Sequence, residues 1–204
     1  DVSEPASPTA VGRLETSGSA LGVTVTGNGR YALVADGASG LQVIDVGNAA
    51  SPTRVGGFDT SGDALGVTLS ADGRYAYVAD SYSGLQVIDV SSPASPTRVG
   101  WFDTSGSARG VTLSADGRYA YVADYSSGLQ VIDVSSPASP TRVGGFDTSG
   151  DAPGVTLSAD ARYAYVAHGS SGLQVSDVSS RSSPPLESGY ETSGNARRVA
   201  YPTD

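Results

Sequence analysis

The sequence predicts an all-β protein, namely a β-propeller of four-stranded antiparallel blades with a 44-residue repeat, four repeats and part of a fifth. Three observations support this prediction. One segment recurs at a fixed spacing, each unit divides into four strand-like stretches, and both faces of those strands are apolar. No window carries helical periodicity long enough to compete with this reading.

The internal repeat is the strongest of these observations. A Pro-Thr pair returns every 44 residues, and the units 54–97 and 98–141 differ only at the aligned positions 57/101, 63/107, 65/109, 81/125 and 82/126. We treat 1–204 as a single propeller domain or a propeller fragment. The repeats are placed at approximately 10–53, 54–97, 98–141 and 142–185, with a partial unit at 186–204.

Each unit is expected to hold four strands, which we call a to d from the innermost outward. In the second unit a β-branched stretch leads into Asp72-Gly73, a strong hairpin signal. The proline-rich segment 91–96 cannot continue a ladder, because proline has no amide donor. Strands a to d of this unit are expected at 66–70, 75–79, 85–90 and 98–102.

These strands lack a clean alternation of polar and apolar residues. Val87 and Ile88 lie on opposite faces of strand c, and Tyr77 and Val78 lie on opposite faces of strand b. Both faces therefore need burial, which propeller blades achieve by stacking around an axis. A β-solenoid would also bury both faces, but its rungs usually have shorter repeats and parallel links.

The segments 84–93, 75–80 and 58–60 carry a family resemblance that recurs in every period. Through them each unit resembles the LVIVD-repeat family of β-propellers, which is common among exported proteins of bacteria and archaea. The resemblance implies a propeller fold and an extracellular or cell-surface location in a prokaryote, and it brings no shared catalytic residues. The fourth unit departs from the pattern twice, with Ser176 in place of Ile and His168 in place of Asp.

Composition excludes several functional classes. The chain has no Cys, Met or Lys. It contains twelve arginines and 21 acidic residues, which gives a net charge of -9. We therefore expect no nucleic-acid partner and no membrane insertion. Disulfides and thiol chemistry are excluded, and the single His168 excludes a zinc site of several imidazoles. An acidic composition without Lys or Cys suits an exported protein that stays soluble in salt, and it suits a GC-rich genome equally well.

The ends of the chain allow three interpretations of how the propeller ring is completed. A strand d is expected at 11–15 and a final strand a at 197–201, with no strand b or c between them. The chain is then part of a longer propeller, or it closes as four blades with 11–15 completing the last unit, or it forms a homo-oligomer by strand exchange. The start at Asp1, without Met, favours the fragment.

The d–a and b–c loops are expected to emerge on one side of the propeller, which we call the loop face. Oxygen-rich side chains gather there, so this face could coordinate calcium or bind a protein or carbohydrate. The alternative is that each Asp caps its own loop. The b–c loops begin with Asp36, Asp80, Asp124 and His168, and the d–a loops carry Ser19, Asp63, Ser107, Asp151 and Asn195.

Differences between the near-identical central units fall mainly in these loops. We interpret them as adaptation to a partner, because aromatic residues and Arg are enriched at binding hot spots. The competing interpretation is that exposed loops drift without constraint. The predicted partner-binding residues are Asp63, Asp80, Tyr82, Trp101, Arg109, Asp124, Tyr125, Asp151 and His168.

A second repeated set of charges is assigned to the scaffold. A carboxylate ends strand c in every unit and needs a donor. Arg54, Arg98 and Arg142, nine residues on, are the expected partners. Another basic set comprises Arg30, Arg74, Arg118 and Arg162, and the carboxylates are Asp45, Asp89, Asp133 and Asp177.

No motif in the chain favours an enzyme. A Ser-His-Asp triad would have to use His168, and no Gly-x-Ser-x-Gly elbow surrounds a serine. We therefore predict a non-catalytic exported binding module that presents its loop face to a protein or carbohydrate. The alternative is a structural, self-assembling component of a cell surface or filament.

Overall fold

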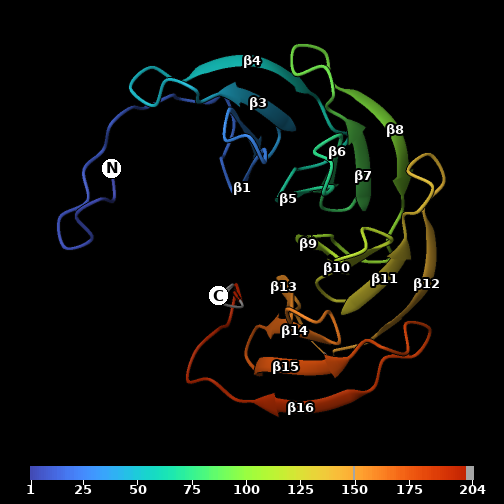
Figure 1. The fold of residues 1–204 in the computed structure, drawn as a ribbon. Coiled ribbons are helices and arrows are strands. Elements are labelled where there is room, and N and C mark those ends of the chain that lie inside the picture. The colour runs from blue at the N-terminus through green and yellow to red at the C-terminus, as the bar shows by residue number, and fades with distance from the viewer. Residues whose placement is uncertain (149, 201–204) are drawn as a thin grey trace.

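The computed structural model describes residues 1–148 and 150–200, and within them the chain forms four separate antiparallel sheets. The sheets stand as blades in an open arc around a common centre (Figure 1). Blade 1 holds β1 (Gly22–Val25), β2 (Tyr31–Ala35), β3 (Leu41–Asp45) and β4 (Thr53–Phe58). Blade 2 holds β5 (Gly66–Leu69), β6 (Tyr75–Ala79), β7 (Leu85–Asp89) and β8 (Thr97–Phe102). Blade 3 holds β9 (Gly110–Leu113), β10 (Tyr119–Ala123), β11 (Leu129–Asp133) and β12 (Thr141–Phe146). Blade 4 holds β13 (Gly154–Leu157), β14 (Tyr163–His168), β15 (Gly172–Asp177) and β16 (Leu186–Tyr190).

The predicted fold class and the order of strands within a blade are confirmed. Each sheet runs in sequence order from its first to its fourth strand, and the first strands β1, β5, β9 and β13 contact one another in turn at the centre. The hairpin predicted at Asp72-Gly73 is also present, with Gly73 at a φ of 70°. The backbone amide of Arg74 donates to Asp72 at 3.0 Å and holds this turn.

The apolar core lies between blades rather than within them. One cluster joins Leu33, Leu41 and Val43 of blade 1 to Val78 and Ile88 of blade 2, and equivalent clusters join the later pairs. We call the side of a blade that meets the next blade its trailing face, and the opposite side its leading face. Burial on both faces explains why the strands do not alternate cleanly.

A column of glycines lets the innermost strands approach closely. A Cβ added to Gly66 would lie 2.9 Å from the carbonyl oxygen of Arg109 and 3.3 Å from the Cα of Gly110. Gly22, Gly110 and Gly154 occupy the same position in the other blades and also face the backbone of the following unit. These contacts bring the loops of neighbouring blades together at one end of the arc.

The repeated ion pair exists, but the expectation that Arg54, Arg98 and Arg142 form it is wrong. Those arginines donate to the side chains of Gln42, Gln86 and Gln130. The strand register explains this, because Ile88 lies opposite Arg98 while Asp89 lies opposite Thr97 and, on its other side, Tyr75. The carboxylates therefore meet the arginine that precedes strand b, as in Arg74–Asp89 at 3.1 Å.

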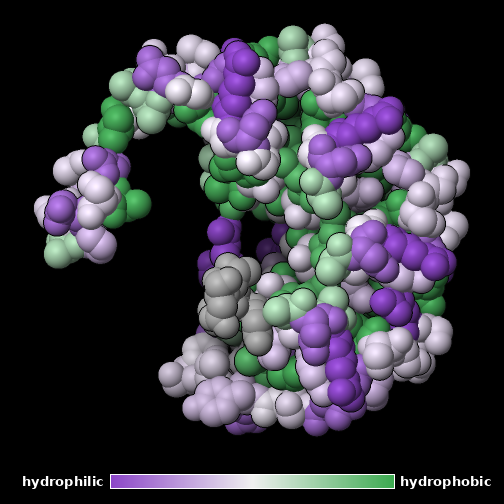
Figure 2. Space-filling model, viewed as in Figure 1, coloured by the Kyte–Doolittle hydropathy of each residue, from purple (hydrophilic) through white to green (hydrophobic). Residues whose placement is uncertain are grey.

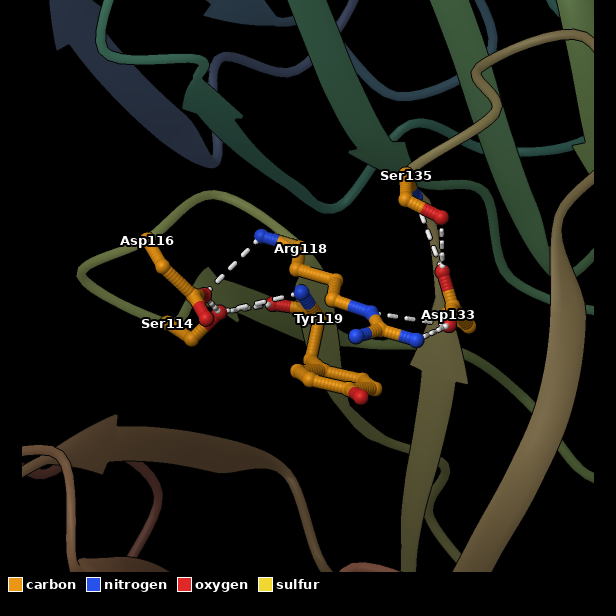
Figure 3. A network of polar contacts seen from close by, with 6 residues as sticks. All are labelled: Ser114, Asp116, Arg118, Tyr119, Asp133 and Ser135. Atoms are coloured by element: carbon orange, nitrogen blue, oxygen red, sulfur yellow. Dashed lines mark hydrogen bonds and ion pairs between the residues drawn. The ribbon is translucent and has the colours of Figure 1, made fainter.

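Figure 3 shows this network in blade 3. Arg118 donates to Asp133 at 3.2 Å, and the hydroxyl and amide of Ser135 donate to the other carboxylate oxygen. The Ser135 bonds come first among the causes that lower the pKa of Asp133, and Arg118 adds to them. The same arginine lies over the ring of Tyr119, 5.1 Å from its centroid. The set fixes the strand ends on the side away from the loop face, which agrees with a scaffold role.

The arc does not close within the described residues, so the four-blade reading is wrong. Blade 4 is completed by its own β16, and the strand predicted at 11–15 is not formed. The strand predicted at 197–201 is not formed at 197–200 either, and Tyr201, with the rest of 201–204, lies outside the described residues. Both segments lack a neighbouring strand to pair with, because no strand b or c lies between them. Residues 1–148 and 150–200 contain no apolar helix of membrane-spanning length.

Candidate functional site: the loop face

Backbone bridges between blades build the loop face. The first or second residue of each b–c loop is bridged to an alanine in the d–a loop of the next unit. In blade 2, for example, Ser81 and Ala108 exchange two backbone hydrogen bonds of 2.9 and 3.0 Å, whereas in blade 4 the amide of Ala196 donates to the carbonyl of Gly169. The other bridges are Gly37–Ala64, Tyr125–Ala152 and Gly169–Ala196. Both kinds of loop therefore emerge on the same side, as the sequence predicted.

The b–c loops enter this bridge with a left-handed backbone residue. Gly37 and Gly169 adopt it in blades 1 and 4, whereas Ser81 and Tyr125 adopt φ values of 51° and 48° without being glycine. A non-glycine residue in this region costs about 1–2 kcal/mol. Tyr125 therefore occupies its place on the loop face at some expense in stability, and such strain often accompanies a functional site.

Three side chains from three loops converge at Tyr125. The guanidinium carbon of Arg109 lies 3.9 Å from the centroid of the Tyr125 ring, a close cation–π contact. Asp151, from the next d–a loop, lines the same cleft, and its carboxylate is the main cause that raises the pKa of the Tyr125 phenol. Arg109 and Tyr125 are two of the positions at which the central units differ.

A cleft of about 710 Å³ opens around this trio near the centre of the arc. Its volume lies in the range of small-molecule sites, which is roughly 300–1,000 Å³. Asn195 and Arg197 from the C-terminal tail, residues 191–200, also line the cleft. The lining thus combines an aromatic ring, basic groups and an acidic group.

Asp80 and Asp124, predicted to bind a partner, are instead buried in an internal clamp. Asp124 accepts from the hydroxyl of Thr104 at 2.6 Å and from the amide of Gly106 at 2.9 Å. Asp80 accepts from the equivalent Thr60 and Gly62 at 2.6 and 3.0 Å. Burial raises the pKa of both carboxyls. Neither reaches the surface, and we do not carry them into the site.

His168, also predicted to bind a partner, is likewise buried. Both of its ring nitrogens lie without a hydrogen-bond partner among the described residues. It stands where the other blades have the clamp aspartate, and a Cβ on Gly150 would lie 3.0 Å from the imidazole. In this blade the hydroxyl of Thr148 donates to the carbonyl of Gly150 at 2.8 Å. His168 thus lies beneath the loop that borders the cleft.

This substitution leads to a stability prediction. His168→Asp should raise the free energy of unfolding by about 1 kcal/mol, because a carboxylate there would restore an acceptor and remove two unsatisfied nitrogens. Urea denaturation followed by circular dichroism would measure the change. His168→Ala, which removes the imidazole without supplying an acceptor, is the control, and an equal gain in both variants would contradict the restored clamp.

The remaining predicted residues lie apart from the cleft. Asp63 and Tyr82 border a shallower depression over blades 1 and 2, where Tyr82 is 81% exposed. Trp101 lies on the outer strand β8, opposite Gln86, and is 54% exposed on the rim of the arc. Of the predicted set, Arg109, Tyr125 and Asp151 come together at the central cleft, and Asp63 and Tyr82 share the depression over blades 1 and 2.

Sequence reasoning missed the threonine of the clamp and the part played by the tail. The clamp threonine could have been found from the sequence, because a threonine recurs at the same place in every repeat. These threonines are Thr16, Thr60, Thr104, Thr148 and Thr192. No cluster of three or more acidic or His side chains able to hold a metal ion occurs among the residues described. The clamp explains why the repeated acids do not gather, since each is held inside its own blade.

Solved structures similar to this one share its fold at low sequence identity. A putative 6-phosphogluconolactonase from Bacteroides fragilis has a TM-score of 0.73 at 16% identity, over 86% of this chain and 55% of its own. Hydrazine synthase from Kuenenia stuttgartiensis gives 0.71 at 15%, over 91% and 53%. The β-propeller domain of Cps50 (Swd1) from Myceliophteria thermophila gives 0.65 at 15%, over 83% and 59%. The chain therefore spans about half the length of these structures.

No curated protein matches the chain. The sequence model of the LVIVD repeat, by contrast, matches four consecutive windows, 17–60, 61–104, 105–148 and 149–192. Each window has the length of the repeat read from the sequence and contains one complete blade, with strands a to d in order. The chain therefore belongs to the LVIVD-repeat family.

Proposed function

We propose that this protein is a non-catalytic binding module that holds a protein or carbohydrate partner in the cleft of its loop face. The observation that carries the proposal is the convergence of Arg109, Tyr125 and Asp151 at one strained loop. A planar ring with charged groups beside it can stack on a sugar or an aromatic side chain and orient it by hydrogen bonds.

Repeat symmetry supports adaptation at this place. The aligned residues in the preceding unit are Leu65, Ser81 and Ser107, none of which offers a ring or a charge. The cleft therefore gained its aromatic and charged groups at positions where the scaffold tolerates small or aliphatic ones.

We further propose that the module works outside the cytoplasm, at or beyond a prokaryotic cell surface. Its acidic composition without Lys or Cys supports this placement. Detection of the native protein by antibody in fractionated cells tests it, and recovery only in the cytoplasmic fraction would overturn it.

A printed array of oligosaccharides and peptides tests the binding function. We expect at least one class of probe to bind, and Arg109→Leu with Tyr125→Ser, the residues of the preceding unit, to weaken that binding at least tenfold. Arg54→Leu is the matched control. Leucine already occurs at the aligned position of the last unit, Leu186, and Arg54 lies on the outer strand β4, away from the cleft. Equal binding by both variants, or no bound probe in either class, would reject the proposal.

A further inference from the structure

The cleft of the loop face gathers positive charge in an otherwise acidic protein. The chain has a net charge of -9, yet three of its twelve arginines line this one cleft, and only one of the described residues that line it is acidic. In Figure 2 strongly hydrophilic side chains border the hollow at the centre of the arc. The arginines are Arg109, Arg197 and Arg198, and the acidic residue is Asp151.

Two of these arginines occupy the same place in the repeat. Arg109 follows Ala108 and Arg197 follows Ala196, the alanines of two loop-face bridges. The residue at this place lines the cleft in every unit, and it is apolar in three units and arginine in two. The cleft therefore sets basic groups beside apolar surface around the centre of the arc. The five residues are Leu21, Leu65, Arg109, Pro153 and Arg197.

The positive charge of these arginines is not neutralised by ion pairs. Five pairs of arginine and carboxylate form among the described residues, and none of them includes Arg109, Arg197 or Arg198. Arg109 lies against the Tyr125 ring, and Arg198 donates to the carbonyl of Leu21. Because a guanidinium carries five N–H donors, these contacts leave further donors for a ligand.

The other polar groups of the cleft suit hydroxyl groups. Asp151 offers a carboxylate, which accepts hydrogen bonds from donors such as hydroxyls, and Asn195 offers an amide that both donates and accepts. The Tyr125 ring adds a flat surface on which a sugar ring can stack. A ligand that satisfies the whole cleft therefore carries a negative group for the arginines and hydroxyl donors for Asp151.

We propose that the cleft binds an acidic sugar, whose carboxylate or sulfate group pairs with Arg109 and Arg197 and whose hydroxyl groups donate to Asp151. This inference rests on the proposed binding function and names the class of ligand that the same cleft takes. Arginine can bind a carboxylate through two parallel hydrogen bonds, which orients the ligand as well as holding it. Excess positive charge in a cleft also draws an anionic ligand towards it.

An acidic peptide satisfies the cleft less well than an acidic sugar. The side chains of Asp and Glu offer carboxylates to the arginines, but when ionised they have no hydrogen to donate to Asp151. A peptide rich in these residues also brings further negative charge close to Asp151, which is repulsive. One ring of a uronic acid, by contrast, supplies both the acceptor for arginine and the donors for Asp151.

Isothermal titration calorimetry tests the ligand class with four probes of similar size. They are trigalacturonate, its uncharged methyl ester, a sulfated galactose trisaccharide and the peptide triglutamate. We expect at least one of the two acidic sugars to bind about tenfold more tightly than the methyl ester and the peptide, and its affinity to fall as sodium chloride is added. The tighter of the two acidic sugars identifies the acidic group that the arginines prefer.

Two variants test the role of the arginines. Arg109→Leu and Arg197→Leu each introduce the residue found at this place in the first two units, and each should weaken the acidic sugar about tenfold, the loss expected for a hydrogen bond to a charged group. Both arginines are exposed, so the melting curves should stay unchanged. Arg54→Leu removes the same charge away from the cleft and should leave the affinity unchanged. An equal loss in this control would mean that net charge, not the cleft, attracts the sugar, which contradicts the inference.

The outcomes separate this inference from the proposed binding function. If the methyl ester or triglutamate binds as tightly as the acidic sugars, the cleft is a binding site but not one for acidic sugars, so the inference fails and the proposed function stands. If none of the four probes binds, the inference fails as well. The array of oligosaccharides and peptides then decides separately whether the cleft has another partner.

Discussion

Gly84→Ala is expected to lower the free energy of unfolding by about 4 kcal/mol, a large part of the roughly 5–15 kcal/mol of an ordinary domain. Gly84 ends the b–c loop of blade 2 at a φ of 70°. A Cβ there would lie 2.2 Å from the carbonyl oxygen of Phe102 and 2.7 Å from the amide nitrogen of Thr104. Both are backbone atoms, which cannot rotate away as a side chain can. Overpacking and the left-handed backbone each contribute, at about 1–3 and 1–2 kcal/mol.

The chain offers a control that separates these two contributions. Gly73 has the same φ of 70°, but a Cβ there would meet nothing within 4 Å. Gly73→Ala should therefore cost only about 1 kcal/mol, the conformational part alone. The aligned Ala161 already sits at a φ of 54°, so Ala161→Gly should recover about as much. Chemical denaturation of the three variants compares them, and equal losses at Gly84 and Gly73 would show that the backbone contact is relieved by local movement.

The fold could be predicted from the sequence because the strand, turn and burial signals of each repeat all indicate the same structure. β-branched strands, Asp-Gly turns and apolar residues on both strand faces recur at one spacing, and only stacked sheets satisfy all three. The ion pair was assigned to the wrong arginine for a reason of the same kind. Spacing along the chain suggested Arg98 for Asp89, whereas the hairpin register of β6 and β7 sets Arg74 beside it. Distance in sequence does not reveal which side of a strand a partner occupies.

The candidate site was only partly readable. Variation between the central units drew attention to Arg109 and Tyr125, which do meet, because exposed loop positions can change without harm to the scaffold. Asp80 and Asp124 were misplaced on the surface, because a carboxylate at the start of a loop looks the same whether it faces solvent or a buried hydroxyl 20 residues earlier. The loop that covers each aspartate is far from it in sequence, so this contact depends on the tertiary structure. The contribution of the C-terminal tail to the cleft depends on the tertiary structure in the same way.

Asp124→Ala is expected to lower the free energy of unfolding by about 3 kcal/mol. The side chain is fully buried, and its loss strands the hydroxyl of Thr104 and the amide of Gly106 without their acceptor. An unsatisfied buried donor costs about 1–3 kcal/mol. Urea denaturation measures the loss, and His168→Ala in the next blade is the matched comparison, since no such acceptor is removed there. An equal loss at the two positions would mean that cavity formation, rather than the clamp, dominates.

Asp124→Asn isolates the charge of the same group through its pH dependence. Burial raises the pKa of Asp124 in the folded protein above its ordinary value of 3.8, so between these two pKa values the folded state binds more protons than the unfolded state. Stability contributed by this titration is then fully present below pH 3.8 and is lost as pH rises through the folded pKa. The advantage of the wild type over the neutral Asn variant should therefore shrink as pH rises from about 3.5 towards neutrality. The surface pairs such as Arg118–Asp133 have lowered carboxyl pKa values and act in the opposite direction, but they are common to both proteins and cancel in the difference. A difference that grows with pH would show that the ionised carboxylate is the form the clamp prefers.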